Sequence, residues 1–436
     1  MNSSQNTPFE SILVDSKDGE WGEGEPAVGL REALIIRGTD FTKLSDPAAP
    51  FPRRWIREHV VERKKLRPGD LILETAGGTS TQSTGRSVLL KQLFFEEHQG
   101  VPVLCASFSR YLRLNRKKYS PRFVWYVLQS LYGSGYMAVF NIQHTGVSRF
   151  QYTAFKKHTE LSIPALPIQR KIAAILSAYD ELIENNQRHI ALLEKLAEEI
   201  YREWFVRFRF PGHKNVKVVK GVPSGYEVRT LGSFADEIKR GVKKKNLADD
   251  EKYVGLEHIP RHSIALNEWT TADTVESDKL VFQERDILFA KIRPYLHKVA
   301  IAHFSGACSS DTIVLRPKKR CYEGYLLFTV FSDTFVELAT VASKGTKMPR
   351  ADWGFLKRLE LIVPNEQLLE RYQAQFDVVF RRIANLLRSN RLLSTSRDLL
   401  LPRLISGKLS VENLNIQFPP GMIEELDQTS VLTHHA

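Results

Sequence analysis

The residues of this chain best suited to chemistry are lysines and arginines gathered beside glycines. Lys344-Gly345-Thr346-Lys347 and Lys239-Arg240-Gly241 each combine two cations with a glycine. Glycine lets the backbone approach a phosphate closely, and the cations neutralise it. Arginine, asparagine, glutamine and histidine can also read base edges in the major groove of DNA. These segments therefore favour contact with a nucleic acid.

The candidate contacts form two sets of loop residues, one in each half of the chain. The first set is Arg110, Arg113, Lys117, Gln143 and His144, with Arg116, Lys118, Asn141 and Arg149 beside them. The second set is Lys239, Arg240, Lys243, Lys291, Arg293, Tyr295, Lys344, Thr346, Lys347 and Arg350. A single surface cation is usually only solvated, so the argument depends on the recurrence of the sets at equivalent places.

The sequence patterns of common catalytic and metal centres are missing. The loop of residues 77–87, GGTSTQSTGRS, has the wrong glycine spacing for a phosphate-binding loop, and Arg86 stands where lysine is required. There is no GxGxxG after a strand, no HExxH and no NPP-type methyltransferase motif. The three cysteines, Cys105, Cys308 and Cys321, form no CxxC or Cys/His cluster. They argue against structural zinc and disulfides, and for a reducing compartment.

Length and composition bound the class of protein. At 436 residues, two or three domains are expected, and 42% hydrophobic residues indicate a globular chain. The net charge of +12 and the isoelectric point near 9.4 favour a polyanionic partner. No apolar run approaches the roughly eighteen residues that span a bilayer, and the N-terminus lacks an export signal, so we expect a cytoplasmic protein.

The sequence contains a weak internal duplication with a shift near two hundred residues. YVGLEHI (253–259) corresponds to LIIRGTDF (34–41), and GACSSDTIVLRP (306–317) to the stretch around Cys105, so that Cys308 aligns with that cysteine. Arg285-Asp286-Ile287 corresponds to Gly69-Asp70-Leu71. Several landmarks in the same order indicate two copies of one domain.

Each copy is followed by a long amphipathic helix, predicted over residues 167–208 and 367–407. The first has a heptad seam with a broad apolar shoulder, so more than one helix is expected to pack on it. Asn186 and His189 interrupt the seam, and Asn186 is either a satisfied polar core residue or a register pin. The seam and shoulder comprise Ile172, Ile175, Tyr179, Leu182, Leu193, Leu196, Ile200, Leu176, Ile183, Ile190, Ala197 and Trp204.

The second helix repeats this pattern and supplies a partner for the first. Its seam comprises Tyr372, Phe376, Val379, Ile383, Leu386, Leu393 and Leu400, interrupted by Asn390 and Arg397. Pro402 is expected to end or kink the helix, and Gly407 to stop it. A pseudo-two-fold duplication makes the helices antiparallel and brings Asn186 near Asn390.

We therefore predict an α+β fold with two similar globular domains separated by two long antiparallel helices, a coiled-coil spacer. The domains are residues 1–166 and 229–366, with a linker at 209–228 and a peripheral tail at 408–436. The first 25 residues or so are expected to form a loose arm leading into a strand.

The chain resembles the specificity subunit of type I restriction-modification enzymes. The residues that carry this resemblance are PIQRKIAAILSAYDELIENN, EIYREWFVRF, YVGLEHI, DILFAKIRPYLHKVAIA, GACSSDTIVLRP, SKGTKMPRADW and LLPRLISGKL. The resemblance implies a non-catalytic subunit whose two target-recognition domains read a split site on double-stranded DNA. It also implies docking of DNA methyltransferase subunits, usually two, that bind S-adenosylmethionine, and of motor-nuclease subunits that use ATP and magnesium.

Two questions stay open at this stage. Ile190, Trp204 and Phe205 are candidates either for the face that docks the methyltransferase or for the intramolecular core. The alternative functions are a self-contained DNA methyltransferase or nuclease with an unrecognised motif, and a scaffold that binds only protein.

Overall fold

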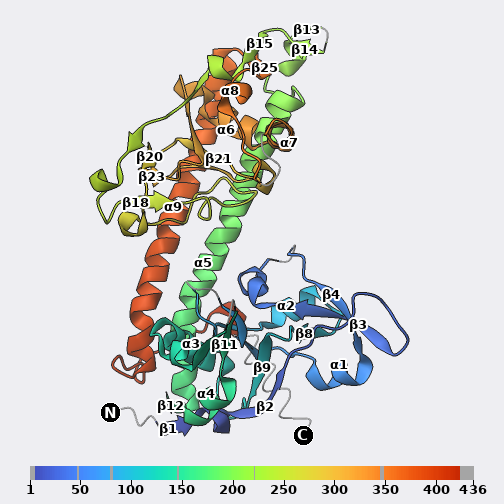
Figure 1. Cartoon of the computed structure of the whole chain (residues 1–436), viewed down its shortest axis with the longest axis vertical. Coiled ribbons are helices and arrows are strands. Elements are labelled where there is room, and N and C mark those ends of the chain that lie inside the picture. Colours follow the sequence, from blue (N-terminus) through green and yellow to red (C-terminus); the bar gives the residue numbers. More distant parts are fainter. Residues whose placement is uncertain are drawn as a thin grey trace. The chain divides into compact units, whose positions relative to one another are not determined.

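The computed structural model describes residues 5–46, 49–78, 82–144, 147–219, 221–343 and 348–422, without the side chains of residues 143, 144, 147 and 274. The chain forms two compact units. Unit 1 comprises the residues up to Glu184 and those from Leu392 onward. Unit 2 is the continuous segment from Asn185 to Arg391. Figure 1 shows the elements of both units.

Unit 1 is built on a four-stranded antiparallel sheet in the order β2-β9-β5-β7. A second sheet has the order β4-β3-β8, a third the order β10-β11-β6, and β1 pairs with β12. The strands are β1 Gln5–Pro8, β2 Leu13–Asp18, β3 Leu30–Ile36, β4 Arg53–Arg57, β5 Leu71–Glu74, β6 Ala76–Gly78, β7 Ser87–Leu89, β8 Val103–Cys105, β9 Ser109–Leu114, β10 Asn141–His144, β11 Val147–Phe150 and β12 Glu160–Ile163. The shorter helices are α1 Glu58–Lys64, α2 Gln92–Glu97, α3 Pro121–Gly133 and α4 Tyr152–His158.

Unit 2 repeats the four-stranded sheet in the order β16-β24-β21-β22 and has a five-stranded sheet β17-β20-β23-β18-β19. Its strands are β13 Val218–Val219, β14 Val222–Pro223, β15 Tyr226–Thr230, β16 Ala235–Glu237, β17 Gly241–Val242, β18 Lys252–Val254, β19 Thr270–Thr271, β20 Lys279–Phe282, β21 Ile287–Ala290, β22 Val299–Ile301, β23 Gly306–Cys308, β24 Thr312–Pro317 and β25 Glu360–Pro364. The shorter helices are α6 Glu323–Phe331, α7 Asp333–Val341 and α8 Trp353–Leu356, and the short 3-10 helix η9 is Pro294–Leu296.

Strand pairing confirms the duplication that the sequence predicts. If the four strands of each sheet are numbered by their order in the chain, both sheets have the spatial order 1-4-2-3. Both units also contain one parallel pair in which a cysteine lies beside an aliphatic residue: Cys105 beside Ile36, and Cys308 beside Val254. The two halves therefore share one topology as well as sequence landmarks.

A buried carboxylate bound by an arginine recurs at the same place in both units. Arg113 donates to Asp70 at 2.9 and 2.7 Å, and Arg316 donates to Asp286 at 2.7 Å through each of two nitrogens. The residue before each aspartate has positive φ, 83° at Gly69 and 76° at Arg285. The bond to Asp286 also raises the pKa of the Arg316 guanidinium. Each pair joins the turn before the second sheet strand to the fourth strand.

A buried glutamine near the start of each long helix bonds that part of the helix to the first turn of a shorter helix in the same unit. Gln169 accepts a hydrogen bond from the Ser120 backbone N–H at 2.9 Å, where Ser120 caps α3. Gln373 accepts one from the Gly324 N–H at 3.0 Å in the first turn of α6. These amides satisfy N–H groups that a helix start leaves without intrahelical partners.

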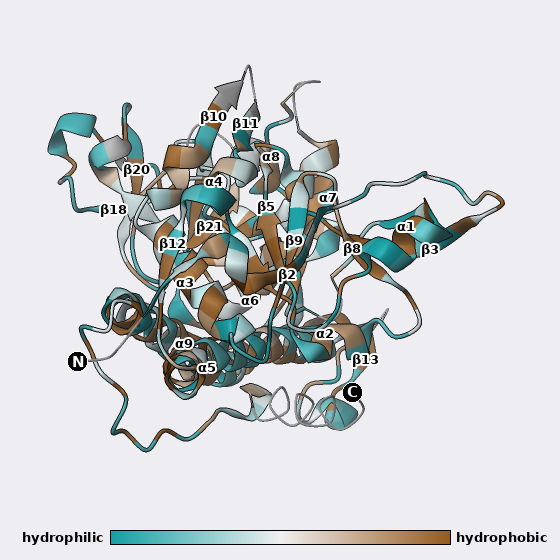
Figure 2. Ribbon diagram, turned by 90° about the horizontal axis from the view of Figure 1, so that it is seen from below, coloured by the Kyte–Doolittle hydropathy of each residue, from teal (hydrophilic) through white to brown (hydrophobic). Residues whose placement is uncertain are grey.

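The long helices are α5, Leu166–Tyr201, and α9, Glu366–Ile405, and α5 continues into a π-helical turn over Arg202–Val206. The predicted helices at 167–208 and 367–407 are confirmed with small shifts at their ends. Pro402 lies inside α9 rather than ending it, and the helix stops before Gly407, whose φ is +72°. Figure 2 shows hydrophilic and hydrophobic residues on both helices, in keeping with their amphipathic pattern.

The predicted seam of α5 is partly wrong. Leu182 and Leu196 are each 51% exposed, and His189 is exposed. Ile190, Ala197 and Tyr201 are buried instead, while Leu193 is partly buried and packs beside them. The buried stripe follows the predicted shoulder because the part of α5 in unit 2 packs on the strands and shorter helices of that unit as well as on α9, and because a straight helix drifts from a strict heptad.

Both ends of the described chain contribute to unit 1, which corrects the expectation of a loose arm and a peripheral tail. Phe9 and Ile12 are fully buried, and β1 pairs with β12. Val411 and Met422 are buried in the same hydrophobic core. The sequence signal fails here because short segments that cover a core carry no clear periodicity.

Among the described residues, no single helix has both the length and the apolar character needed to cross a membrane. The bent pair Arg320–Phe331 and Asp333–Val341 meets the length and composition criteria only when its helices are taken together. All nine residues of α6, Glu323–Phe331, are buried in the protein.

Replacing Asp286 tests the buried pair of unit 2. Asp286→Ala leaves the Arg316 guanidinium without its bidentate partner, and we expect a loss of about 2–3 kcal/mol in the free energy of unfolding. Urea unfolding of the full chain measures it. Asp236→Ala, which removes an exposed partner of Lys318, is the matched control and should change stability by less than about 0.5 kcal/mol. Equal effects of the two variants would contradict a structural role for the pair.

The amide pair of unit 2 tests the register pin. Asn186 Nδ2 donates to Asn390 Oδ1 at 2.8 Å, and Asn390 is buried. Asn186→Leu leaves that buried amide without its partner and should lower stability by about 1–3 kcal/mol, whereas the double variant with Asn390→Leu should recover most of it. Calorimetric unfolding of the three proteins separates these outcomes. A double variant as unstable as the single one would reject the pairing account.

Candidate nucleic-acid interface

Backbone register identifies two arginines at the same place in the two units. Thr75 directly follows β5, and its backbone N–H donates to the Phe108 carbonyl at 2.9 Å. Lys291 directly follows β21, and its backbone N–H donates to the Asp311 carbonyl at 2.8 Å. The carbonyls of Thr75 and Lys291 accept from Phe150 N and Ala351 N, both at 2.9 Å. The residues just before these donors are Arg149 and Arg350, which pair with Ala76 and Ile292. Arg149 and Arg350 therefore occupy equivalent positions in the two units.

Both arginines are exposed, and Arg149 lies in β11 rather than in a loop. The Arg350 side chain is 53% exposed and reaches Asp311 at 3.3 Å, a weak surface ion pair. A guanidinium in this state can exchange its carboxylate for a phosphate or the acceptor edge of a guanine at little cost. The repeated position gives each unit one arginine suited to nucleic acid.

The structure gathers further predicted residues of unit 2 around Arg350. Glu237 forms ion pairs with Lys239, at 3.0 Å, and with Lys291, at 3.8 Å. Arg293 donates its backbone N–H to Pro349 O at 2.9 Å. Its side chain is exposed, as is the ring of Tyr295, at 53%. The predicted residues that the fold brings together here are Lys239, Lys291, Arg293, Tyr295 and Arg350.

Other predicted residues lie elsewhere or outside the description. Arg240 and Lys243 flank β17 at the edge of the five-stranded sheet, and both are exposed. Lys344, Thr346 and Lys347 lie outside the described residues, although their loop directly precedes Met348. Gln143 and His144 belong to β10, but their side chains are outside the description.

The predicted residues of unit 1 divide by role. Arg113 is occupied by Asp70, and Lys117 is exposed. Arg110 pairs with Asp18 at 2.6 Å and lies 4.4 Å from the centre of the Tyr152 ring. It lines a cavity of about 600 Å³ together with Lys157 and His158, which sequence reasoning missed. The signal for these two was the basic run Lys156-Lys157-His158 directly before the last strand of the unit.

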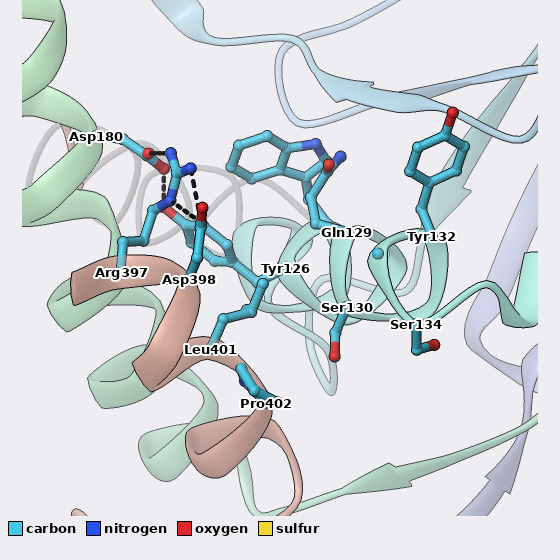
Figure 3. A pocket seen from close by; sticks show the side chains of 12 residues that line it. Tyr126, Gln129, Ser130, Tyr132, Ser134, Asp180, Arg397, Asp398, Leu401 and Pro402 are labelled. Carbon is cyan, nitrogen blue, oxygen red and sulfur yellow. Dashed lines mark hydrogen bonds and ion pairs between the residues drawn. The ribbon is translucent and has the colours of Figure 1, made fainter. Parts of the chain in front are cut away.

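A second cavity in unit 1, of about 570 Å³, is lined by residues of α3, by Asp180 of α5 and by the last turns of α9 (Figure 3). Arg397, predicted on the seam, donates to Asp180 at 2.5 Å and to Asp398 at 2.9 and 2.8 Å. The Tyr126 hydroxyl donates to the other oxygen of Asp180, and burial raises the pKa of Tyr126 well above its usual value. Asp180, Arg397, Asp398 and Tyr126 thus bond one another, and these contacts join α3, α5 and α9 within unit 1.

The buried thiols are equally unreactive. Burial raises the pKa of Cys105 and of Cys308 to about 12. Because the thiolate is the nucleophile and the metal ligand, neither cysteine is available for that chemistry at neutral pH. Their equivalent positions in the parallel strand pairs indicate a packing role.

The three candidates for a face that docks the methyltransferase were Ile190, Trp204 and Phe205. Ile190 and Phe205 are buried in unit 2, and the Phe205 ring lies 4.8 Å from that of Tyr372. Trp204 is partly buried and packs on the same tyrosine at 5.8 Å. Burial favours the intramolecular alternative for these three. The exposed apolar side chains of the long helices are Leu182, Leu192, Leu196, Val378, Leu392 and Leu399.

Comparison with known proteins agrees with the duplicated architecture. The model of the type I restriction modification DNA specificity domain matches residues 68–195 and again 223–375. The MjaIX specificity subunit of a type I restriction enzyme from Methanocaldococcus jannaschii is 26% identical over 270 residues, 59% of this chain and 62% of that protein. The EcoDI specificity subunit from Escherichia coli is 26% identical over 263 residues, 52% of this chain and 55% of that protein. The match thus spans less than two thirds of either relative.

The fold is similar to the crystal structure of a type I restriction-modification S subunit from M. genitalium. The TM-score is 0.53 at 16% identity, covering 92% of this chain and 96% of that one. At this identity the likeness shows the fold alone. The two matched segments make up more than half of the chain, and each contains the same buried aspartate–arginine pair. The chain therefore belongs to the family of type I restriction-modification DNA specificity domains.

Proposed function

We propose that this chain is the DNA-recognition subunit of a type I restriction-modification complex and that each unit reads one half of a bipartite target. The observation that carries the proposal is the equivalence of Arg149 and Arg350, two exposed arginines at one register position of a duplicated fold. The net charge of +12 supports a polyanionic ligand. The relatives, whose names describe specificity subunits, support the role within the complex.

The long helices serve as the spacer in this proposal. α5 has 36 residues and α9 has 40. At 1.5 Å per residue they measure about 54–60 Å, the length of roughly sixteen to eighteen base pairs. The target-recognition domains are then residues 1–166 and 229–366, the helices 167–208 and 367–407, the linker 209–228 and the tail 408–436. One chain could address two major-groove segments on the same face of a duplex.

The catalytic work belongs to other subunits in this proposal. The chain itself is non-catalytic and docks DNA methyltransferase subunits, two of them, together with motor-nuclease subunits. S-adenosylmethionine, ATP and Mg²⁺ bind to those partners. The exposed leucines of the long helices, among them Leu182 and Leu196, are the docking candidates, since Ile190 and Phe205 are buried.

Modification-sensitive sequencing of the host genome, with and without an intact copy of this gene, tests the function. We expect one methylated motif with two specific halves and a fixed non-specific spacer, lost when the gene is deleted. Methyl transfer or cleavage by the isolated chain would instead establish the alternative of a self-contained enzyme. DNA affinity that is indifferent to added salt would support a protein-only scaffold.

Replacing Arg350 tests the interface of unit 2. Arg350→Ala in the complex with the methyltransferase should weaken DNA binding about tenfold or more, because one guanidinium contact is worth about 1–3 kcal/mol. Binding titrations at several salt concentrations then distinguish its two roles. A phosphate contact lowers affinity for all sequences and reduces the salt slope by about one, whereas a base contact relaxes one position of one half-site.

The matched control is Arg209→Ala, which removes another exposed arginine of unit 2 with one distant carboxylate partner, Glu203 at 3.8 Å. It should leave affinity within about twofold of the parent. Arg149→Ala should act on the opposite half-site from Arg350→Ala. If both variants changed the same half-site, or neither changed binding, the equivalence argument would fail.

Shortening both helices tests the spacer. Deleting residues 182–188 together with 388–394 removes one heptad from each helix, about 10 Å or three base pairs of length. The methylated motif read from cells that carry this variant should keep both half-sites and shorten its spacer by about three base pairs. An unchanged spacer in a folded, active variant would reject the helices as the ruler.

A further inference from the structure

Three metal-ligating side chains from distant parts of the sequence meet in unit 2, and one of them, His297, flanks the same short helix as Arg293. They are His262, in the loop after β18, His297, directly after η9, and Asp333, the first residue of α7. One ligand atom from each can be chosen so that all three lie within 4.8 Å of one another. His297 is only 4% exposed, whereas His262 and Asp333 are open to solvent.

We propose that these residues form a binding site for a divalent transition-metal ion of the zinc class. Two imidazoles and one carboxylate are a ligand set that zinc uses, with a fourth position left for water. His297 Nδ1 and the Asp333 carboxylate are 3.3 Å apart. Ligands held at about 2.0–2.1 Å around a tetrahedral ion are separated by roughly this distance. His262 is exposed, and one of its ring nitrogens would be the third protein ligand.

The hydrogen bond on the far side of the His297 ring orients it for this role. His297 Nε2 lies 2.7 Å from the backbone carbonyl of Phe331, which can only accept, so Nε2 carries the proton. A neutral imidazole then turns the lone pair of Nδ1 toward the Asp333 carboxylate. Two acceptors that face each other repel, and a cation between them removes the repulsion. Metal-bound histidines commonly donate their other ring nitrogen to a carbonyl in this way.

The backbone holds both histidines in an unusual conformation. His262 and His297 each have φ of 51°, in the left-handed region that side chains other than glycine rarely adopt. The His262 N–H donates to His297 O at 3.0 Å, and the two ring centres are 4.3 Å apart. Backbone strain of this kind persists where the surroundings enforce it, and it concentrates at functional sites.

A half-buried carboxylate of α5, that of Glu194, fixes the loop that carries His262. Glu194 Oε1 accepts from Ser263 Oγ at 2.7 Å and from the N–H groups of Ile264 and Ala265, both at 2.8 Å. Three bonds to one oxygen anchor the residues directly after His262. The loop is therefore held in place before an ion arrives, which lowers the entropic cost of binding.

Among the residues that the structure describes, such a group of three ligands occurs in unit 2 and not in unit 1. Ile301 of β22 pairs with Ile287, and Leu89 of β7 pairs with Leu71, so Ile301 and Leu89 are equivalent. His297 precedes Ile301 by the same number of residues as Gly85 precedes Leu89, which makes Gly85 the equivalent of His297. Gly85 also has positive φ, +102°, but offers no ligand. The turn is thus common to both units, whereas the histidine is not. One ion per chain is the expected stoichiometry.

The ion would join η9 to the start of α7 and so fix the turn that carries Arg293 and Tyr295. Both residues belong to the candidate interface, so the consequence for DNA binding rests on the proposed function. Binding of the ion does not rest on it, since the three ligands and their supports are independent of any DNA contact. The two claims can therefore fail separately.

The experiment titrates the chelator-treated full chain, free of any histidine tag and of DNA, with Zn²⁺ and separately with Co²⁺. We expect one ion per chain by calorimetry, a visible absorption band of tetrahedral Co²⁺, and no comparable binding of Mg²⁺, which prefers oxygen ligands. His262→Ala and Asp333→Ala change exposed side chains and should each weaken Zn²⁺ binding at least about a hundredfold and abolish the Co²⁺ band. His59→Ala, an exposed histidine of unit 1, is the matched control and should leave both unchanged.

The result that overturns the proposal is Zn²⁺ affinity in His262→Ala and Asp333→Ala equal to that of the parent, or a parent that binds Zn²⁺ no better than Mg²⁺. Circular dichroism and urea unfolding of the apo variants show that they are folded, so that lost binding is not lost structure. If the metal binds as expected but genome sequencing finds no bipartite motif, the proposed function fails and the metal site stands.

Discussion

An apolar stripe that runs the length of a 36-residue helix must be covered along its whole length, and the architecture follows from how this is done. In unit 1 the stripe is covered by α3, the sheet strands and the C-terminal segment, with Ile172 and Leu176 in the same core as Leu404. In unit 2 it is covered by α6 and α9, with Ala197 and Phe205 in the same core as Tyr372. The long helices are therefore part of two globular cores, and a change in their packing affects the core of a unit directly.

Polar groups inside these cores fix the geometry that apolar packing leaves free. The two aspartate–arginine pairs, the two capping glutamines and the asparagine pair each satisfy buried donors and acceptors in a single arrangement. Apolar surfaces tolerate sliding and repacking, whereas a buried amide or carboxylate does not, because an unpaired one is costly. The aspartate–arginine pairs and the glutamine contacts recur in both units and help to keep the two units in one fold.

The sequence revealed what depends on periodicity and order. The two long helices, the duplication and the closeness of Asn186 to Asn390 followed from heptad spacing and repeated landmarks. The burial of Ile190 in place of Leu182 did not, because it depends on which face the rest of the unit covers. Phe9 and Val411 were missed because short covering segments leave no pattern.

Prediction of the site was limited in a different way. Lys291, Arg293 and Arg350 were identified from residue type and loop position, and the fold brings them together. The equivalence of Arg149 and Arg350 needed strand register, which sequence alone does not give. His262, His297 and Asp333 lie about 35 residues apart in sequence, a spacing that matches no ligand motif. Only tertiary structure places such residues together.

The division of the chain also bears on the order in which the protein is made. Unit 2 is one continuous segment, whereas unit 1 needs Leu404 and Val411, which follow the whole of unit 2, to complete its core. At ribosomal rates of about 5–20 residues per second, on the order of ten to forty seconds pass between synthesis of the first part of unit 1 and synthesis of the C-terminal segment that completes its core. The domain synthesised first is thus the last to close. During that interval its exposed apolar surface is the part of the nascent chain most in need of a chaperone.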